Sequence, residues 1–239
     1  MTAVSDFTDV TDSTDLAGLA VRAAVELETA SAQEIVGWAA ETFGSRFCVT
    51  SSMTDAVLID LVARQAPGTD VVFLDTGYHF AETVGTRDAV AATYPVNLLT
   101  ITPLRTVAEQ DAEHGQRLHE RDPDLCCAMR KVEPLERALR DYDAWATGLR
   151  RDEAPSRANA PVVAWDARRG KVKVNPIARW NQDDVDAYVA AHNVLVNPLL
   201  MDGYTSVGCG PCTRRTAPGE SVRDGRWPGR AKVECGING

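Results

Sequence analysis

The chain has 239 residues, of which 44% are hydrophobic and 25% charged, an ordinary composition for a soluble globular protein. Its formal net charge of -9 argues against nucleic acid as the main partner. No apolar run is long enough to span a bilayer and the N-terminus lacks a secretion signal. We therefore expect a cytoplasmic protein with no membrane partner, in a reducing compartment where clustered cysteines indicate metal or redox chemistry.

The first part of the chain alternates helical and strand patterns. Ser31 and Glu34 fit a capping box, and apolar residues then recur at helical spacing as far as Phe43. Short apolar runs predict buried strands, and each of the first two is followed by a helical pattern. The predicted strands are 47–50, 71–74 and 96–101, and the predicted helices 57–62 and 81–92. This alternation predicts an α/β fold with a parallel sheet flanked by helices.

The second part continues with mixed elements and then loses its periodicity. A helical stretch is expected over 131–140, a strand over 144–147 and an amphipathic helix over 181–191. Residues 162–165 and 171–174 predict a β-hairpin. From Gly203 onward frequent glycines indicate mobile backbone.

Polar turns follow the first two predicted strands, at Ser51–Asp55 and Leu74–Gly77. In open α/β sheets, ligands bind beyond the carboxyl ends of the strands, where helix N-termini favour anions. The first turn suits a phosphate or a ribose, but Ser, Thr and Asp are also the usual helix caps, so both interpretations stay open. His79 lies beside the second turn, where a structural role is favoured.

Four of the six cysteines form two close pairs, Cys126–Cys127 and Cys209–Cys212. Two such pairs fit a tetrathiolate site holding zinc or an iron–sulfur cluster. Adjacent helical side chains diverge by roughly 100°, which suits a cubane better than one tetrahedral ion. A second Cys-x-x-Cys, typical of zinc ribbons, is absent. Lys131, one helical turn after Cys127, can offset the charge of a cluster. Zinc remains an alternative.

The remaining thiols have other environments. Cys-Gly-Pro-Cys is also the redox dithiol of thioredoxin, but too little chain follows Cys212 for that fold. Cys48 lies in an apolar strand and is predicted to be a small core residue. Cys235 lies on the glycine-rich tail near Lys232, where a thiol can ionise, move and react. The predicted organisation is therefore an acidic disordered tail (1–15), an α/β nucleotide-binding domain (16–205), and a cluster-binding segment with a mobile tail that carries the catalytic cysteine (206–239).

Several segments together resemble the assimilatory adenylyl-sulfate (APS) reductases, the iron–sulfur-containing branch of the APS/PAPS reductase family. They occur in family order from about residue 45 to the C-terminus. The matching segments are 51–55, 73–83, 126–131, 145–152, 208–214 and 234–237. The resemblance implies an adenine-nucleotide α-hydrolase-like (PP-loop type) fold with a flexible C-terminal tail. It also implies one [4Fe–4S] cluster per chain, with the catalytic nucleophile at Cys235. The implied cluster ligands are Cys126, Cys127, Cys209 and Cys212, and the implied substrate-binding residues are Ser51, Leu74, Lys131, Gly148, Arg157, Arg223 and Arg226.

The implied activity is the reduction of APS to sulfite and AMP by thioredoxin, through an S-sulfocysteine, in sulfate assimilation and cysteine biosynthesis. The four cluster ligands distinguish the APS-using branch from PAPS reductases without a cluster. Two departures from the family pattern stand out. The loop at Arg157 is shorter, and Ile237-Asn238-Gly239 replaces a Leu-His ending, so that Asn238 is the candidate to replace that histidine.

Three other functions stay open on the sequence. They are PAPS reduction, a PP-loop ATP pyrophosphatase and a non-enzymatic iron–sulfur redox sensor. The pyrophosphatase would need a Ser-Gly-Gly-x-Asp-Ser loop, and Ser51–Asp55 lacks its glycines. The sensor is disfavoured by the acidic charge and the separate tail thiol. The oligomeric state is open, and a homo-oligomer is compatible with the sequence.

Overall fold

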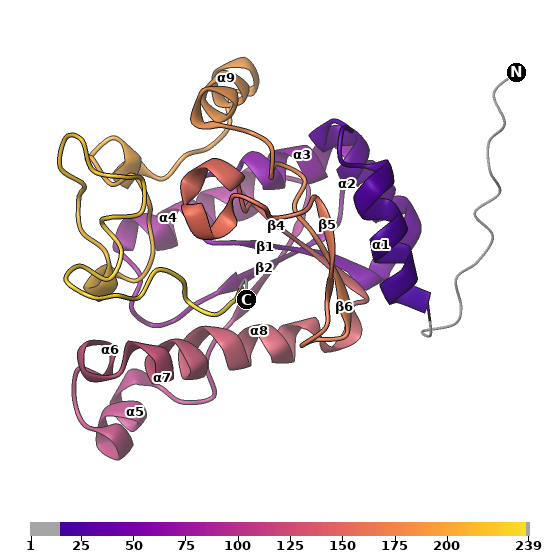
Figure 1. Ribbon diagram of the computed structural model, residues 1–239. Helices are drawn as coiled ribbons and strands as arrows, with labels where there is room; N and C mark the ends of the chain where they lie inside the picture. Colours follow the sequence, from indigo (N-terminus) through magenta and orange to yellow (C-terminus); the bar gives the residue numbers. More distant parts are fainter. Residues whose placement is uncertain (1–14, 238–239) are drawn as a thin grey trace, which may run out of the picture.

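The computed structural model describes residues 15–237, whose strands form one six-stranded sheet (Figure 1). The strand order is β3-β2-β1-β4-β6-β5, with every neighbouring pair parallel except β5 and β6. The strands are β1 (Phe47–Ser51), β2 (Asp70–Leu74), β3 (Asn97–Ile101), β4 (Ala144–Thr147), β5 (Val163–Asp166) and β6 (Lys171–Val174). The predicted parallel sheet is confirmed, and so is the hairpin, which forms the antiparallel edge.

Helices lie on both faces of this sheet. They are α1 (Leu16–Glu26), α2 (Ala32–Phe43), α3 (Val57–Gln65), α4 (Ala81–Thr93), α5 (Val107–His114), α6 (Leu118–Arg121), α7 (Pro123–Cys127), α8 (Glu133–Ala138) and α9 (Gln182–His192). None in the described part of the chain is long and apolar enough to cross a membrane. The predicted acidic tail lies outside the described residues except for Asp15, which pairs with Arg22 of α1 at 2.9 Å.

Alternate side chains of the strands enter two separate cores, as the period of two in a β-strand requires. Val49 and Phe73 pack with α1, α2 and α3 on one face. Cys48 and Trp145 pack on the opposite face with Leu135 of α8. Figure 1 shows α8 on one side of the sheet and α1, α2 and α3 on the other. Cys48 is fully buried, which confirms its prediction as a core residue.

Local sequence signals explain the ends of several helices. The Ser31 hydroxyl accepts a hydrogen bond from the Glu34 amide (3.2 Å), and the Glu34 carboxylate accepts one from the Ser31 amide (2.7 Å). The predicted capping box is therefore confirmed. Asn181 caps α9 in the same way, and the predicted amphipathic helix there is confirmed, with Val185 and Tyr188 buried.

The helical stretch predicted over 131–140 begins earlier, at Pro123. It runs through α7, a π-helical turn (Ala128–Val132) and α8 to a 3-10 turn that ends at Asp141. Its first half carries no apolar periodicity, since Cys126 and Cys127 line a pocket instead of packing in either hydrophobic core. The helices α1, α5 and α6 were not predicted from the sequence, although Leu16, Leu19, Ala20 and Ala23 of α1 recur at helical spacing.

Candidate functional site

Three predicted substrate-binding residues lie at the carboxyl ends of neighbouring strands. Ser51 ends β1, Leu74 ends β2 and Gly148 directly follows β4. β1 lies between β2 and β4, so the connections from these strands diverge to either side of it. The strand order reverses at this point, which is where open α/β sheets form a ligand crevice. The fold therefore brings Ser51, Leu74 and Gly148, which the family resemblance implied as substrate-binding residues, to the carboxyl end of the sheet.

The turn after β1 is held by its own polar groups. Met53 adopts a left-handed conformation (φ 58°), and its amide donates to the Ser51 hydroxyl at 3.1 Å. Asn197, which is fully buried, donates to the Met53 carbonyl oxygen at 3.0 Å. These hydrogen bonds hold the Ser51 side chain in place at the carboxyl end of β1.

The turn after β2 is closed by His79. Its Nε2 lies 2.9 Å from the carbonyl oxygen of Leu74, and its ring packs on Phe73 with 4.9 Å between centroids. Burial lowers the pKa of His79, so the imidazole is neutral at physiological pH. The geometry agrees with the structural role that the sequence favoured.

The four cysteines Cys126, Cys127, Cys209 and Cys212 line one pocket, which we call the cysteine pocket. Two come from α7 and two from a 3-10 turn more than eighty residues later. The predicted convergence of the two pairs is therefore present in the fold. The pocket is also lined by Tyr78, His119, Pro123, Arg130, Lys131, Pro211 and Trp227.

Backbone and hydroxyl contacts fasten the later pair to the turn after β2. The amide of Gly210 donates to the Tyr78 carbonyl oxygen at 2.7 Å. The hydroxyl of Thr76, which is fully buried, lies 3.3 Å from the Cys209 sulfur. The Trp227 amide donates to the Cys212 carbonyl oxygen at 2.9 Å. The segment thus keeps its place by contacts that its sequence periodicity did not reveal.

Arg130 forms a charged wall of the cysteine pocket. Its guanidinium is almost fully buried, donates to Gln110 at 3.1 Å and to the Thr76 carbonyl oxygen, and lies 5.3 Å from the ring centre of Tyr78. The sequence included Arg130 in a recognised segment but assigned it no role. The signal available in the sequence was an arginine in the same motif as two cysteines.

Cys126 and Cys127 are poor acids without a bound cation. Burial, followed by the charges of the neighbouring thiols, raises the pKa of Cys126 to about 12. Burial raises the pKa of Cys127 to about 11, against the opposing charge of Lys131. Metal binding here must release protons. In residues 15–237, no group of three or more His, Cys, Asp or Glu side chains has the spacing needed to hold a single metal ion.

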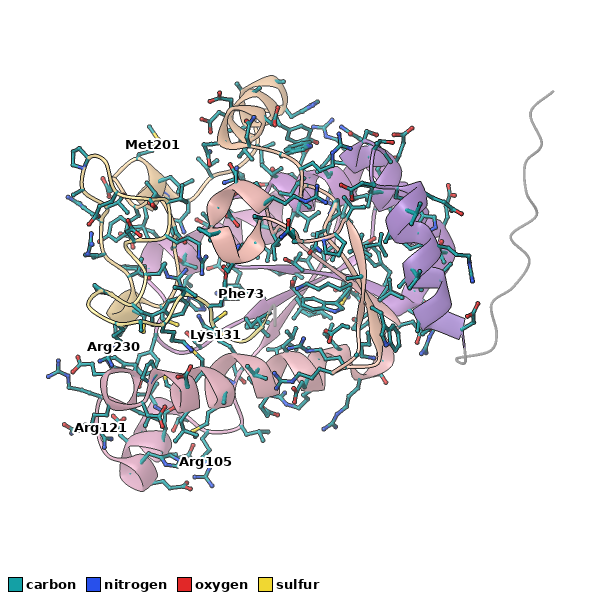
Figure 2. The ribbon with its side chains drawn as sticks, viewed as in Figure 1. Phe73, Arg105, Arg121, Lys131, Met201 and Arg230 are labelled. Atoms are coloured by element: carbon teal, nitrogen blue, oxygen red, sulfur yellow. The ribbon has the colours of Figure 1, made fainter. Side chains whose placement is uncertain are left out.

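Lys131, whose side chain is labelled in Figure 2, lines the cysteine pocket and also acts on the tail thiol. Burial lowers the pKa of Lys131, but the charges of Cys209, Cys235 and Cys127 outweigh it and raise that pKa. Burial likewise raises the pKa of Cys235, yet Lys131, the Ile237 amide and Arg226 outweigh it, so that this pKa is lowered. The structure therefore places a thiol with enhanced acidity beside the cysteine pocket, with one ammonium group between them.

The predicted arginines lie around the tail that carries Cys235. Arg157 contacts Glu234 with two hydrogen bonds, of 2.6 and 2.8 Å. Arg223 donates to Glu234 at 3.2 Å and to the Val233 carbonyl oxygen at 2.9 Å. Arg226 donates to the Val207 carbonyl oxygen at 3.2 Å. All three arginines therefore lie close to the tail that carries Cys235. Arg157 does so although its loop is shorter than in the family pattern.

Trp227 joins this basic group to the cysteine pocket. Its ring is nearly fully buried, and three cations lie over it, with Arg226 at 4.8 Å, Lys232 at 5.5 Å and Arg223 at 6.0 Å from the ring centre. Cation–π contacts of this kind hold cations in place without neutralising them. Trp227 and Glu234 were assigned no functional role from the sequence, although both lie in the glycine-rich segment between predicted site residues.

Known proteins resemble the chain throughout its length. The model of the phosphoadenosine phosphosulfate reductase domain matches residues 46–215. A Streptomyces coelicolor protein named adenosine 5'-phosphosulfate reductase is 67% identical over 94% of this chain and 95% of its own length. A relative of the same name from Mycolicibacterium smegmatis is 55% identical over 97% of this chain and 99% of its own length.

Solved structures agree on the fold. A phosphoadenylyl-sulfate (PAPS) reductase from Candida auris, in a phosphate complex, is 30% identical with a TM-score of 0.70, covering 82% of this chain and 96% of its own. A Candida glabrata FMN adenylyltransferase (13% identity, TM-score 0.55, 87% and 76% coverage) shares the fold alone. These similarities confirm the predicted adenine-nucleotide α-hydrolase-like (PP-loop type) fold. The chain belongs to the phosphoadenosine phosphosulfate reductase domain family, alongside the bacterial proteins named adenosine 5'-phosphosulfate reductase.

Proposed function

We propose that this protein is a cytoplasmic enzyme of sulfate assimilation and cysteine biosynthesis that reduces APS to sulfite and AMP with a thioredoxin-type dithiol. The observation that carries the proposal is the place of Lys131, which acts electrostatically on the tail thiol Cys235 and on thiols of the cysteine pocket. A nucleophile of lowered pKa beside a cluster of cations suits attack on an anionic sulfonyl donor. The names of the close relatives support the choice of APS.

In this proposal the two ends of the substrate bind to different parts of the site. Ser51, Leu74 and Gly148 contact the adenosine at the carboxyl edge of the sheet. Lys131, Arg223 and Arg226 contact the phosphosulfate, and Arg157 joins them. Cationic donors of this kind are suited to the charge that develops on the bridging oxygen as its bond to sulfur breaks.

The reaction takes place at the sulfur of Cys235. The thiolate attacks the sulfonyl sulfur of APS, a sulfur–sulfur bond forms, and the sulfur–oxygen bond to AMP breaks. AMP leaves with the electron pair of the bridging oxygen, and Cys235 becomes an S-sulfocysteine. A dithiol then attacks the Cys235 sulfur and sulfite leaves with the bonding pair. The second thiol of the reductant resolves the mixed disulfide, so that the dithiol supplies both electrons and Cys235 returns to a thiolate.

The cysteine pocket suits one [4Fe–4S] cluster ligated by Cys126, Cys127, Cys209 and Cys212. In a cubane each cysteine binds a different iron, so the ligands need not meet at one ion. The indole Nε1 of Trp227 lines this pocket, is buried and has no hydrogen-bond partner among the described residues. With the Thr76 hydroxyl on Cys209, it offers a donor of the kind that sulfur ligands accept. When bound, the cluster supplies a negatively charged anchor that fixes α7 and the 209–212 turn.

The tail must leave the site for the second half of the reaction, because a protein dithiol needs in-line access to the S-sulfocysteine. Some of the contacts that hold it are polar and lie near the surface. Arg230 donates to the Glu120 carbonyl oxygen, and Lys232 pairs with Asp124, which is largely exposed. Exposed ion pairs contribute little stability, so these contacts can open. In this proposal the cluster-binding segment begins at residue 206, and the tail that carries Cys235 is mobile.

An anaerobic assay tests this function. The purified protein is supplied with thioredoxin and with APS or PAPS, and sulfite release is measured while iron, sulfide and visible absorbance are determined on the same sample. We expect sulfite from APS and about four irons per chain. Sulfite from PAPS alone, or a colourless protein that is fully active, would contradict the corresponding part of the proposal.

The matched variant is Cys235→Ser. We expect it to keep its iron content and absorbance but to release no sulfite, because the thiolate is the nucleophile. Mass spectrometry of the wild-type enzyme after APS alone should locate one sulfonate on the peptide that contains Cys235. An adduct on another cysteine would show that the tail thiol is not the nucleophile. The Cys48→Ser variant serves as control because that thiol is buried in the core.

A further inference from the structure

Glu234 directly precedes the predicted nucleophile and lies in the middle of the basic group. Its carboxylate pairs with Arg157 through two hydrogen bonds and with Arg223 through a third. All three side chains are largely removed from solvent, with exposed side-chain fractions of 10% for Arg157, 14% for Arg223 and 25% for Glu234. A planar carboxylate on a guanidinium fork is the arrangement that an oxyanion of a substrate would adopt.

This pairing engages all three nitrogens of the Arg157 guanidinium. Its Nε and Nη2 contact Glu234, while its Nη1 contacts Glu153. By contrast, the Nε atoms of Arg223 and Arg226 are buried and have no partner in residues 15–237. Part of the basic group is therefore ready for an anion, and part is already occupied by one from the tail.

We propose that Glu234 is a positioning residue that imitates the phosphosulfate, holding Cys235 at the arginines in the empty enzyme and competing with the substrate for Arg157 and Arg223. This inference rests on the proposed function. Binding of APS exchanges one anion for another on the same guanidinium groups, so that the charge of the site changes little. The apparent affinity for substrate is then reduced by the fraction of molecules in which Glu234 occupies the arginines.

The ionisation of Glu234 is compatible with this role. Burial raises the pKa of Glu234, but the hydrogen bonds and charge of Arg157 and the charge of Arg223 outweigh it and lower that pKa. The carboxylate is therefore charged at neutral pH. Since Glu234 is adjacent to Cys235, its release from the arginines also frees the backbone that positions the thiol. Substrate binding and tail movement are thereby linked through one ion pair.

The test compares Glu234→Gln with the wild-type protein in its iron-loaded form. Steady-state kinetics with APS give KM and kcat separately, and calorimetric titration with inorganic sulfate gives the affinity of the site for a small anion. We expect KM for APS and the dissociation constant for sulfate each to fall about tenfold, while kcat changes less than KM. Glu234→Asp, which retains the charge, should remain closer to the wild type than Glu234→Gln does.

Glu220→Gln is the matched control, because Glu220 also pairs with an arginine of this segment (Arg214, 2.7 Å) but lies outside the site. It should change neither KM nor sulfate affinity. An unchanged or higher KM in Glu234→Gln, with unchanged sulfate affinity, overturns the competition. Absence of sulfite release by the wild-type protein would instead refute the proposed function, and the sulfate titration would still decide whether Glu234 competes with anions.

Discussion

At the scale of single residues, one cation connects two sulfur centres. Lys131 lies in the π-helical turn after α7, and its ammonium group acts on Cys235 of the tail and on Cys209 and Cys127 of the cysteine pocket. A lysine buried among thiols favours their ionised forms, since an opposite charge nearby stabilises the charged state. Lys131 therefore increases the fraction of Cys235 that is thiolate at a given pH.

We accordingly predict that the reactivity of Cys235 follows a titration with a midpoint below that of an ordinary cysteine, because its pKa is lowered. The thiolate exists above this pKa, so alkylation slows as the pH falls through it. In Lys131→Met the midpoint should move to higher pH and the rate at pH 7 should fall roughly tenfold. Alkylation of the Cys235 peptide, followed by mass spectrometry across pH, measures both.

Lys171→Met is the control for this titration, because Lys171 lies at the start of β6 and donates to the Tyr142 carbonyl oxygen, away from the tail. Its midpoint should match that of the wild type. Coincident profiles for Lys131→Met and the wild-type protein would show that the ammonium group does not set the acidity of Cys235.

At the scale of elements, the C-terminal segment is held by a small apolar anchor. Ile237 packs on the α8 face of the sheet, where Cys48, Val72 and Trp145 form the second core. Ile237 is the residue of the tail that packs against this core. Because Cys235 lies two residues before it, this anchor determines how closely the thiol stays to the arginines.

We predict that Ile237→Ala loosens the tail without unfolding the sheet. Loss of about 1 kcal/mol of apolar contact should reduce the docked population about fivefold and lower kcat/KM by a similar factor. Limited proteolysis should cleave faster at Arg230 and Lys232, while the free energy of unfolding of the whole chain changes by less than about 1 kcal/mol. Val233→Ala, at an exposed residue of the same tail, is the control and should behave as wild type. Equal proteolysis rates for both variants would argue against the anchor.

At the scale of the whole molecule, the sheet and the cysteine pocket are stabilised by different forces. The sheet has apolar cores on both faces, which involve α1, α2 and α3 on one side and α8 on the other. The segment after Gly203 has one isolated bridge, between Thr213 and Arg226, besides turns and a 3-10 helix. The order of that segment therefore depends mainly on contacts at the cysteine pocket.

We therefore predict that iron removal affects this segment and leaves the sheet intact. After anaerobic chelation, hydrogen exchange should become faster in residues 118–132 and 203–237, while β1, β2 and β4 keep their protection. Sulfite release should fall to below about 1%, because the arginines and Cys235 lose their positions. Mass spectrometry of the exchanged peptides measures the first effect. Loss of protection in the central strands would show that the sheet itself depends on iron.

The sequence was sufficient where the signal is local or chemical. The parallel strands, the capping box at Ser31 and the hairpin follow from periodicity and turn chemistry between near neighbours. The two cysteine pairs were recognised as a candidate metal site from their spacing, and the fold brings both pairs to one pocket. The polar turns that begin at Ser51 and Leu74 could be placed at one end of the sheet because the ends of parallel strands meet there, whereas Gly148 was implied by the family resemblance.

Only the tertiary structure decided the contacts between distant segments of the chain. No local pattern pairs Arg157 with Glu234 or places the Trp227 indole beside the cysteines. These depend on loops whose polar residues satisfy one another across the fold and leave no periodic trace. The sequence by itself determined which chemical groups this protein has and the sheet that carries them. The fold decided which charges share one site, because electrostatic contacts depend on distance in space, and the chain brings residues 157, 223 and 234 together only after it is folded.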